Sequence, residues 1–314
     1  MAADGELTVH ESSTIRYPAR VQFGKITIVG VGLLGGSLGL AVKRRKLAHH
    51  VAGYVRRAAS VNDCKKARAV DFATTDLAAA VADADLVILC TPLAQMKPLV
   101  KQLLPALKPG AVVTDVGSVK AGVVQELESL VAKAGGYFVG SHPMAGAEKM
   151  GVSAARADLF ESAMCIVTPT KKSNTAAVRC VEDFWRDIGA RTLRLAPELH
   201  DTFVSRASHL PHVIAAALAG HVLNPAQPET VAAFCATGFR DTTRIASGSP
   251  EMWRDIALAN RKNLVKSLKD FVADLQQFQR ALTKGDAKAI GKFLETAKQR
   301  RDDWCASGAP SPQE

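Results

Sequence analysis

The sequence has few aromatic residues and none of the cysteine spacings that build zinc sites. Phe, Trp and Tyr make up 5% of the 314 residues and hydrophobic residues 47%, so core packing must depend mainly on Ala, Val and Leu. The six cysteines form no CxxC pair, and several lie inside apolar runs. This usage is typical of reduced, structural thiols and predicts a cytoplasmic protein.

Membrane and targeting signals are missing as well. No apolar run approaches the about 20 residues that a spanning helix needs, so we expect no membrane partner. The first residues are polar, include acids and contain no apolar segment of the kind found in secretory signals. We expect residues 1–20 to form a disordered arm and residues 306–314 a flexible tail.

The charge balance is basic, with a formal net charge of +10. Such a balance suits acidic partners, among them nucleic acid, anionic lipid and phosphorylated or carboxylated small molecules, but it also serves plain solubility. The basic residues are spread along the chain, and neither a helix-turn-helix nor an RNA-binding motif is evident. We therefore expect a small-molecule substrate and no nucleic acid.

Apolar runs alternate with helical patterns over the first two thirds of the chain. The runs predict strands at 25–32, 50–55, 84–92, 111–118, 137–142 and 163–169, and the patterns between them predict helices such as 34–46, 96–107 and 119–133. Strands that are apolar along their whole length indicate a parallel sheet covered on both faces. The fold class is thus α/β, with a doubly wound parallel sheet of the Rossmann type.

Strand-like runs stop after Pro197, and helical periodicity takes over. An apolar stripe at spacings of three and four runs from Leu264 to Leu282, with Gly285 as a C-cap, and a second helix follows. We expect a dinucleotide-binding domain over 21–197 and a helical dimerisation and substrate domain over 198–305. So long an apolar stripe suits burial against a second copy, which predicts a homodimer.

A glycine-rich turn follows the first predicted strand and opens a helix. Gly30, Gly32 and Gly35 fit GxGxxG, with Leu33 and Leu34 inside the motif. In this context the glycines permit a tight turn, a close backbone approach to a pyrophosphate and close helix–strand packing. The free N–H groups at the helix start would bind the phosphates.

The end of the second predicted strand bears on the choice of cofactor. An NAD site usually places an acid there, whereas this chain has Arg56 and Arg57 and no acid before Asp63. Arginines at this position could pair with the 2′-phosphate of NADP, or be a solvated surface pair. We favour NADP over NAD, with Thr91 and Pro92 as further cofactor contacts.

Two polar side chains follow neighbouring predicted strands at the edge where ligands lie. Ser118 ends the strand 111–118 and should cap the next helix, and His142 ends the strand 137–142. A histidine bonded to a hydroxyl can take a proton from a substrate. Their structural alternatives are an N-cap serine and a histidine bonded to backbone. The small residues after Pro143 would leave room for a substrate ring.

Five segments in this order, VGVGLLGGSLGLAV, TDVGSVK, GSHPMAGAEKMGV, SHLPHV and GFRDTTRIASGSPEMW, resemble the prephenate/arogenate dehydrogenase family of tyrosine biosynthesis. The resemblance runs from Lys25 to Trp253 and continues more loosely through the last helices. It implies oxidative decarboxylation of a cyclohexadiene to a phenol, with hydride transfer to a nicotinamide. The glycine turn is shared by many dehydrogenases, whereas the histidine and TRIA segments are specific.

The resemblance also implies roles for individual residues. His142 matches the histidine that draws the proton from the ring hydroxyl, and Ser118 matches the serine that bonds both. Further matches are Arg244 for a substrate carboxylate, His209 and His212 lining the pocket, Trp253 reaching the substrate from the partner subunit, and Glu148 near the pocket entrance. A bidentate guanidinium suits a dianionic substrate.

Some positions depart from the family or stay open. Ala147 replaces a common threonine, which removes one hydrogen bond to substrate. Lys120 either touches substrate or cofactor phosphate or is an exposed lysine at a helix start. Arg240 and Arg244 lie four apart, as on a solvated helix face. The spacing of His209 and His212 could suit a metal, but Pro211 lies between them and no carboxylate is near, so we expect none.

The substrate is left open between prephenate, arogenate and both. Ser153 stands where some arogenate-selective relatives carry an acid, which favours prephenate. A more distant alternative is a β-hydroxyacid or 6-phosphogluconate-type dehydrogenase, which would use a catalytic lysine in the helical part. A non-enzymatic alternative is a protein that senses NADP or binds nucleic acid.

Overall fold

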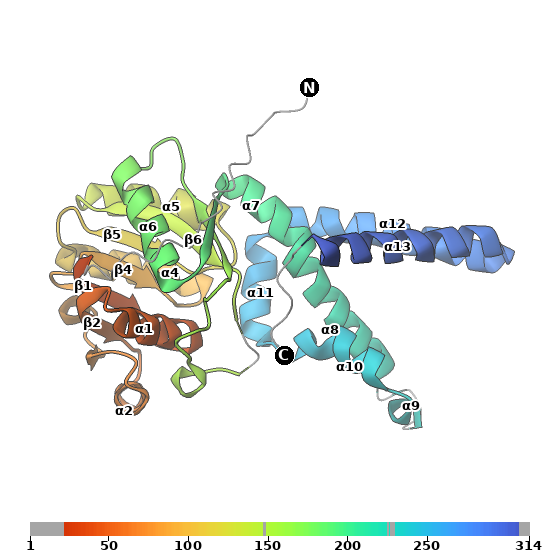
Figure 1. Cartoon of the computed structure of the whole chain (residues 1–314), viewed down its shortest axis with the longest axis horizontal. Coiled ribbons are helices and arrows are strands. Elements are labelled where there is room, and N and C mark those ends of the chain that lie inside the picture. The colour runs from red at the N-terminus through yellow and green to blue at the C-terminus, as the bar shows by residue number, and fades with distance from the viewer. Residues whose placement is uncertain (1–21, 147–148, 225, 227–229, 308–314) are drawn as a thin grey trace.

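The computed structural model describes residues 22–146, 149–224, 226 and 230–307 and shows a twisted sheet with its helices, followed by an all-helical part (Figure 1). The predicted arm at 1–20 and most of the predicted tail lie outside the described residues, as do Ala147 and Glu148. Among the described helices, none combines the length and apolar character needed to cross a bilayer.

One eight-stranded sheet forms the core of the first part, in the order β3-β2-β1-β4-β5-β6-β7-β8. The strands are β1 (Phe23–Val29), β2 (Ala48–Tyr54), β3 (Phe72–Thr74), β4 (Leu86–Leu89), β5 (Val112–Asp115), β6 (Tyr137–Pro143), β7 (Met164–Thr168) and β8 (Arg191–Arg194). The order reverses direction between β1 and β4, which is the switch point where such sheets bind ligands.

The first six strands are parallel, as predicted, but the last two run the other way. β7 pairs antiparallel with β6, with His142 opposite Ile166, and β8 is parallel to β7. The reason lies in the connection from β6 to β7, whose described residues contain a single short turn, η2 (Val152–Ala154), and no crossover helix. A parallel return needs such a crossover. The doubly wound sheet is therefore mostly parallel.

Helices cover both faces of the sheet, as apolar strands require. One apolar cluster joins the sheet to α1, α2 and α6, and a second joins it to α3, α4 and α5. The bounds are α1 (Leu33–Arg45), α2 (Ala58–Ala67), α3 (Leu77–Val81), α4 (Leu93–Leu103) with the turn η1 (Leu104–Ala106), α5 (Ala121–Lys133) and α6 (Thr175–Ile188). The few aromatic side chains are concentrated: Phe160, Phe184 and Trp185 pack edge to face in the first cluster.

The described chain from Pro197 onward contains helices and turns but no strand. These are α7 (Pro197–Val204), the π-helical turn η3 (Ser205–His209), α8 (Leu210–Val222), α9 (Thr230–Ala233), α10 (Thr237–Thr243), the 3₁₀ turn η4 (Arg244–Ser247), α11 (Pro250–Ala259), α12 (Arg261–Lys284) and α13 (Ala287–Ala306). A π turn inside a helix often marks a functional site.

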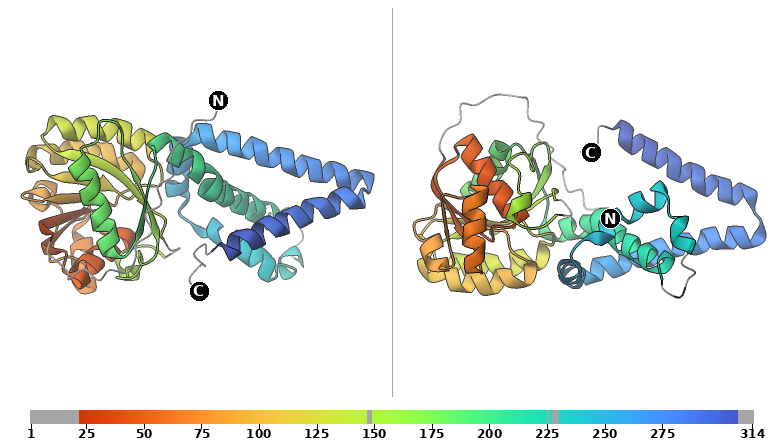
Figure 2. Two further views of the ribbon diagram at one scale, coloured as in Figure 1. Left: turned by 45° about the horizontal axis from the view of Figure 1, so that its top comes forward. Right: turned by 90° about the horizontal axis from the view of Figure 1, so that it is seen from below.

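The predicted pair of long amphipathic helices is confirmed as α12 and α13, which extend away from the sheet (Figures 1 and 2). Gly285 ends α12 in the left-handed conformation, with φ of 62°, as a C-cap should. Within the single chain, many apolar side chains of the two helices stay exposed, including Val265, Leu275, Leu282, Leu294 and Trp304. The rest of the described chain therefore leaves the apolar face of α12 and α13 largely uncovered.

Candidate active site

The glycine turn has the geometry of a phosphate-binding loop. Gly30 has φ of +99°, and a Cβ there would lie 2.8 Å from the Cys90 carbonyl oxygen. A Cβ on Gly35 would lie 2.1 Å from the Gly30 oxygen, so α1 can pack this closely to β1 only without a side chain. A Cβ on Gly32 would meet nothing within 4 Å, which leaves open space at the start of α1. These are the three requirements of a dinucleotide pyrophosphate.

The other predicted cofactor residues lie at the same edge of the sheet. Arg56 and Arg57 are exposed directly after β2, which pairs with β1. Thr91 follows β4 on the other side of β1, and Pro92 is the N-cap residue of α4. The Thr91 hydroxyl is buried and has no hydrogen-bond partner within the described part of the chain. An open glycine cradle and an orphaned hydroxyl fit a nicotinamide dinucleotide.

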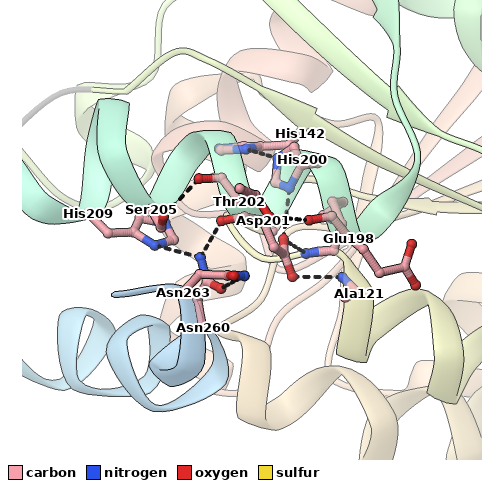
Figure 3. Close-up of polar contacts among 12 residues, drawn as sticks. Ala121, His142, Glu198, His200, Asp201, Thr202, Ser205, His209, Asn260 and Asn263 are labelled. Carbon is pink, nitrogen blue, oxygen red and sulfur yellow. Dashed lines mark hydrogen bonds and ion pairs between the residues drawn. The ribbon is translucent and has the colours of Figure 1, made fainter. Parts of the chain in front are cut away.

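His142 lies near the end of β6 and is 7% exposed. Its Nδ1 lies 2.9 Å from Nε2 of His200, and the Nδ1 of His200 lies 2.8 Å from Oδ1 of Asp201 (Figure 3). His200 and Asp201 come from α7, so this contact joins the sheet to the helical part. Both residues were missed by sequence reasoning, although an adjacent His-Asp pair in the first turns of the helix after the last strand was a visible signal.

The environment keeps His142 neutral. Burial, reinforced by the nearby His200, Lys120 and His209, lowers the pKa of His142 well below its usual 6.5. Burial also lowers the pKa of His200, which Asp201 opposes. A neutral imidazole at neutral pH is the form that can accept a proton.

The prediction that Ser118 caps α5 is wrong, because a residue from another helix supplies the cap. α5 begins at Ala121, with Lys120 rather than Ser118 in the N-cap position and no side-chain cap from within the segment. Instead Oδ1 and Oδ2 of Asp201 accept hydrogen bonds of 2.7 and 2.9 Å from the backbone N–H groups of Lys120 and Ala121. Ser118, half-buried, is left in the loop before the helix. No hydrogen bond joins it directly to His142 in the described residues.

The expectation that Lys120 is an exposed lysine at a helix start is wrong. Its side chain is fully buried, and Nζ is ion-paired with Asp115 and donates to the Ser141 carbonyl oxygen at 2.9 Å. Its contact with substrate or cofactor phosphate stays a prediction. The ammonium ties β5 to β6 beneath His142 and contributes a positive charge to the site. Gly140, one of the small residues near His142, likewise serves packing, because a Cβ there would lie 2.6 Å from the Thr168 hydroxyl.

The helical part brings its two predicted histidines together with Trp253. The ring of His212 stacks on Trp253 with centroids 3.5 Å apart, and the ring of His209 meets the same indole edge to face at 6.1 Å. All three belong to one chain, and the approach of Trp253 to a substrate from the partner subunit stays a prediction. Burial lowers the pKa of His209 to about 4 and also lowers that of His212.

Arg244 is exposed at the start of η4, directly after α10, which carries Arg240. The predicted contacts of Ala147 and Glu148 lie outside the described residues. Asn260, the residue between α11 and α12, was not predicted. It is 4% exposed, and its Nδ2 lies 2.7 Å from the Asp201 carbonyl oxygen and 3.2 Å from Nδ1 of His209 (Figure 3). No sequence signal distinguished it from an ordinary helix-boundary asparagine.

Comparison with known protein families gives two matches that together span most of the chain. Residues 38–194 match the nucleotide-binding domain of prephenate dehydrogenase, and residues 196–299 match its dimerization domain. The chain belongs to the prephenate dehydrogenase family. The oxidoreductase class, a nicotinamide cofactor and a small-molecule substrate follow from this membership together with the glycine turn.

Individual relatives agree with this assignment. Prephenate dehydrogenase of Bacillus subtilis is 34% identical over 88% of this chain and 75% of its own length. Cyclohexadienyl dehydrogenase of Zymomonas mobilis is 36% identical over 88% of this chain and 95% of its own. The crystal structure of prephenate dehydrogenase from Aquifex aeolicus with hydroxyphenyl propionate and NAD⁺ is 33% identical, covers 89% of this chain and 97% of that one, and has a TM-score of 0.83.

No group of three or more His, Cys, Asp or Glu side chains within the described ranges is arranged to hold a metal ion. This includes His209 and His212, whose rings both pack on Trp253. The expectation of a metal-free site stays a prediction.

Proposed function

We propose that the protein converts prephenate to 4-hydroxyphenylpyruvate and CO₂ and passes a hydride to a nicotinamide cofactor. The observation that carries this proposal is the buried, neutral His142 at the edge of the sheet where the glycine turn would hold the cofactor. The bound cofactor would accept the hydride from the carbon that bears the ring hydroxyl. His142 would take the hydroxyl proton and could return it to the phenol oxygen after CO₂ leaves.

Aromatisation of the ring drives the loss of CO₂, so the protein has mainly to position the substrate and move one proton. General base catalysis contributes roughly 10²- to 10⁴-fold in rate. Ser118 would bond the hydroxyl, and Arg244 would bind a substrate carboxylate from η4. His209, His212 and Trp253, which pack on one another, would form the opposite wall.

The test is a grid of initial rates with prephenate or arogenate and NADP⁺ or NAD⁺, followed at 340 nm. Activity with prephenate supports the proposal, activity with arogenate alone replaces the substrate, and activity with both indicates a cyclohexadienyl dehydrogenase. His142→Asn should lower kcat by about 10²- to 10⁴-fold with little change in cofactor affinity. His49→Asn, at an exposed position of β2, is the matched control. An unchanged kcat in the His142 variant would remove it as the base.

For the cofactor, we propose a preference for NADP. Arg56 and Arg57 are exposed after β2, where they could reach a 2′-phosphate. Replacing Arg56 and Arg57 by Asp-Ile should shift the ratio of kcat/KM values toward NAD⁺, while Arg68→Asp, at the exposed end of α2, should leave it unchanged. An unchanged ratio in the double variant would mean that other residues read the 2′-phosphate.

We also propose that the chain forms a homodimer through α12 and α13. The exposed fraction is 48% for Leu275, 54% for Leu282 and 55% for Leu294, all in the long helix pair. A second copy is the natural cover for such a surface. Sedimentation should give a dimer for the parent chain and a more weakly associated dimer for Leu275→Lys. The control variant Lys288→Glu should associate as strongly as the parent chain. A monomeric parent chain would refute the proposal.

A further inference from the structure

One acidic residue, Asp201, connects two histidines through hydrogen bonds, His142 of β6 and His209 of η3. The side chain of Asp201 bonds His200, which bonds His142, and its main-chain carbonyl bonds Asn260, which bonds His209 (Figure 3). We propose that His200, Asp201 and Asn260 are positioning residues that hold His142 and His209 in opposite tautomers, one as an acceptor and the other as a donor. This inference deepens the proposed function and rests on it.

The hydrogen-bond partners assign the tautomer of His142. Asp201 accepts from two backbone N–H groups, so it is an acceptor for His200 Nδ1 as well. With its proton on Nδ1, neutral His200 has a lone pair on Nε2. The 2.9 Å contact must then be filled by a proton on Nδ1 of His142. This leaves the lone pair of His142 on Nε2, ready to accept a substrate proton.

The opposite pattern holds for His209. A backbone carbonyl can only accept, so the Asn260 atom 2.7 Å from the Asp201 carbonyl oxygen must be the amide nitrogen. The Asn260 Oδ1 confirms this orientation, because it accepts a 2.8 Å bond from Asn263 Nδ2. The same Asn260 nitrogen therefore donates to Nδ1 of His209, at 3.2 Å. The proton of neutral His209 is then on Nε2.

Nε2 of His209 is the atom that this arrangement leaves for a ligand. It is buried in a residue that is 1% exposed and makes no hydrogen bond of normal geometry within the described part of the chain. The Ser118 main chain lies near enough to favour a proton on this ring. A buried N–H without an acceptor in good hydrogen-bond geometry is stabilised when a well-placed acceptor arrives. The ligand group that fits it is an acceptor oxygen, such as a substrate carboxylate or carbonyl.

The two tautomers divide the work of the site. His142 receives a proton, whereas His209 donates a hydrogen bond, and neither can exchange roles without breaking the contacts to Asp201. The titratable and charged groups around His142 are His200 from α7, His209 from η3, and Lys120 and Asp115 from the β5–α5 segment. None of these donates to its Nε2 in the described residues.

The decisive experiment measures the tautomers directly and needs no substrate. Histidine labelled with ¹⁵N and ¹³C in the whole protein, with resonances assigned by His142→Gln and His209→Gln, should show at pH 7.5 a proton on Nδ1 of His142 and on Nε2 of His209. Both histidines in the same tautomer, or the reverse pattern, would overturn the inference. If the tautomers are as expected and prephenate is not turned over, the proposed function fails and the tautomer assignment stands.

Kinetic variants test the positioning roles. His200→Leu should lower kcat about 100-fold or more with little change in KM. His200→Gln should recover much of this, because its amide can accept from His142 and donate to Asp201. Asn260→Asp, which puts an acceptor beside His209 Nδ1, should raise KM for prephenate about 10- to 100-fold and change the His209 NMR pattern. Asn224→Asp, in an exposed loop, is the control.

Equal losses in His200→Leu and His200→Gln would assign His200 a purely structural role and contradict the proposal. Unchanged ¹⁵N chemical shifts of His209 in Asn260→Asp would likewise contradict the positioning role of Asn260. Where a variant is unfolded by circular dichroism, the NMR measurement on the parent chain still decides.

Discussion

The ion pair between Lys120 and Asp115 offers a quantitative test of how the sheet supports the site. Both side chains are fully buried, and Asp115 also accepts backbone N–H groups of Gly117 and Ser141 at 2.9 and 3.2 Å. Removing one member of such a pair leaves an uncompensated charge, which typically costs about 3–5 kcal/mol. We expect Lys120→Met to lie near the lower end, since Asp115 keeps its two backbone donors.

Asp115→Leu should cost more than Lys120→Met. It strands the Lys120 ammonium with a single carbonyl acceptor, 2.9 Å away at Ser141, and also deprives two backbone N–H groups of their partner. We expect a loss near the upper end of the 3–5 kcal/mol range. Lys133→Met, an exposed position on α5, should change the free energy of unfolding by less than about 0.5 kcal/mol.

Urea unfolding followed by circular dichroism measures these differences, provided that the m value, the slope of unfolding free energy against urea concentration, stays constant across the variants. A second readout is kinetic. Lys120 is one of the charges that lower the pKa of His142, so Lys120→Met should move the acidic limb of the kcat/KM profile to higher pH. Losses below about 1 kcal/mol in both single variants would refute the reasoning that the pair is an essential buried contact.

Further predictions concern the glycine turn and acid stability. Gly35→Ala should lower the free energy of unfolding by about 1–3 kcal/mol or more, because the new Cβ would lie 2.1 Å from the Gly30 oxygen. The control is Gly122→Ala on α5, where a Cβ would meet nothing within 4 Å. Equal melting temperatures of the two variants would contradict the prediction. Burial lowers the pKa of His209 from 6.5 to about 4, so its contribution to stability is present above pH 6.5 and is lost as the pH falls toward 4. This loss amounts to about 2–3 kcal/mol. His209→Gln should reduce the slope of unfolding free energy against pH between 7 and 4.5, and His49→Gln should not; equal slopes would be the contrary result.

The parts of the fold that follow from local patterns could be predicted from sequence. Apolar runs predicted β1, β2, β4, β5 and β6 but not the short β3, and the glycine turn was identified because GxGxxG follows a strand and opens a helix. The stripe from Leu264 to Leu282 gave α12. The reversed direction of β7 could not be read from its composition, because an apolar run of five residues looks the same in either direction. The missing crossover helix was the available signal.

Candidate site residues could be named from sequence only where they match the family or end a strand. His142 was singled out in this way, whereas the contacts of His200 with His142 and of Asn260 with Asp201 join residues 58 and 59 positions apart in the chain. Pairings over such distances depend on tertiary packing, which a single sequence does not display. Lys120 was misjudged for the same reason: a lysine at a helix start is usually exposed. Its partner, Asp115, lies five residues before it but across a tight loop.

The cap that Asp201 places on α5 bears on how this chain could be dissected. A fragment ending before α7 would contain every strand of the sheet, yet the first turn of α5 would lose the carboxylate that satisfies the N–H groups of Lys120 and Ala121. Losing a helix cap typically costs about 1 kcal/mol. The boundary that composition suggests near Pro197 is therefore not a clean cleavage point, and an autonomous nucleotide-binding fragment should include α7.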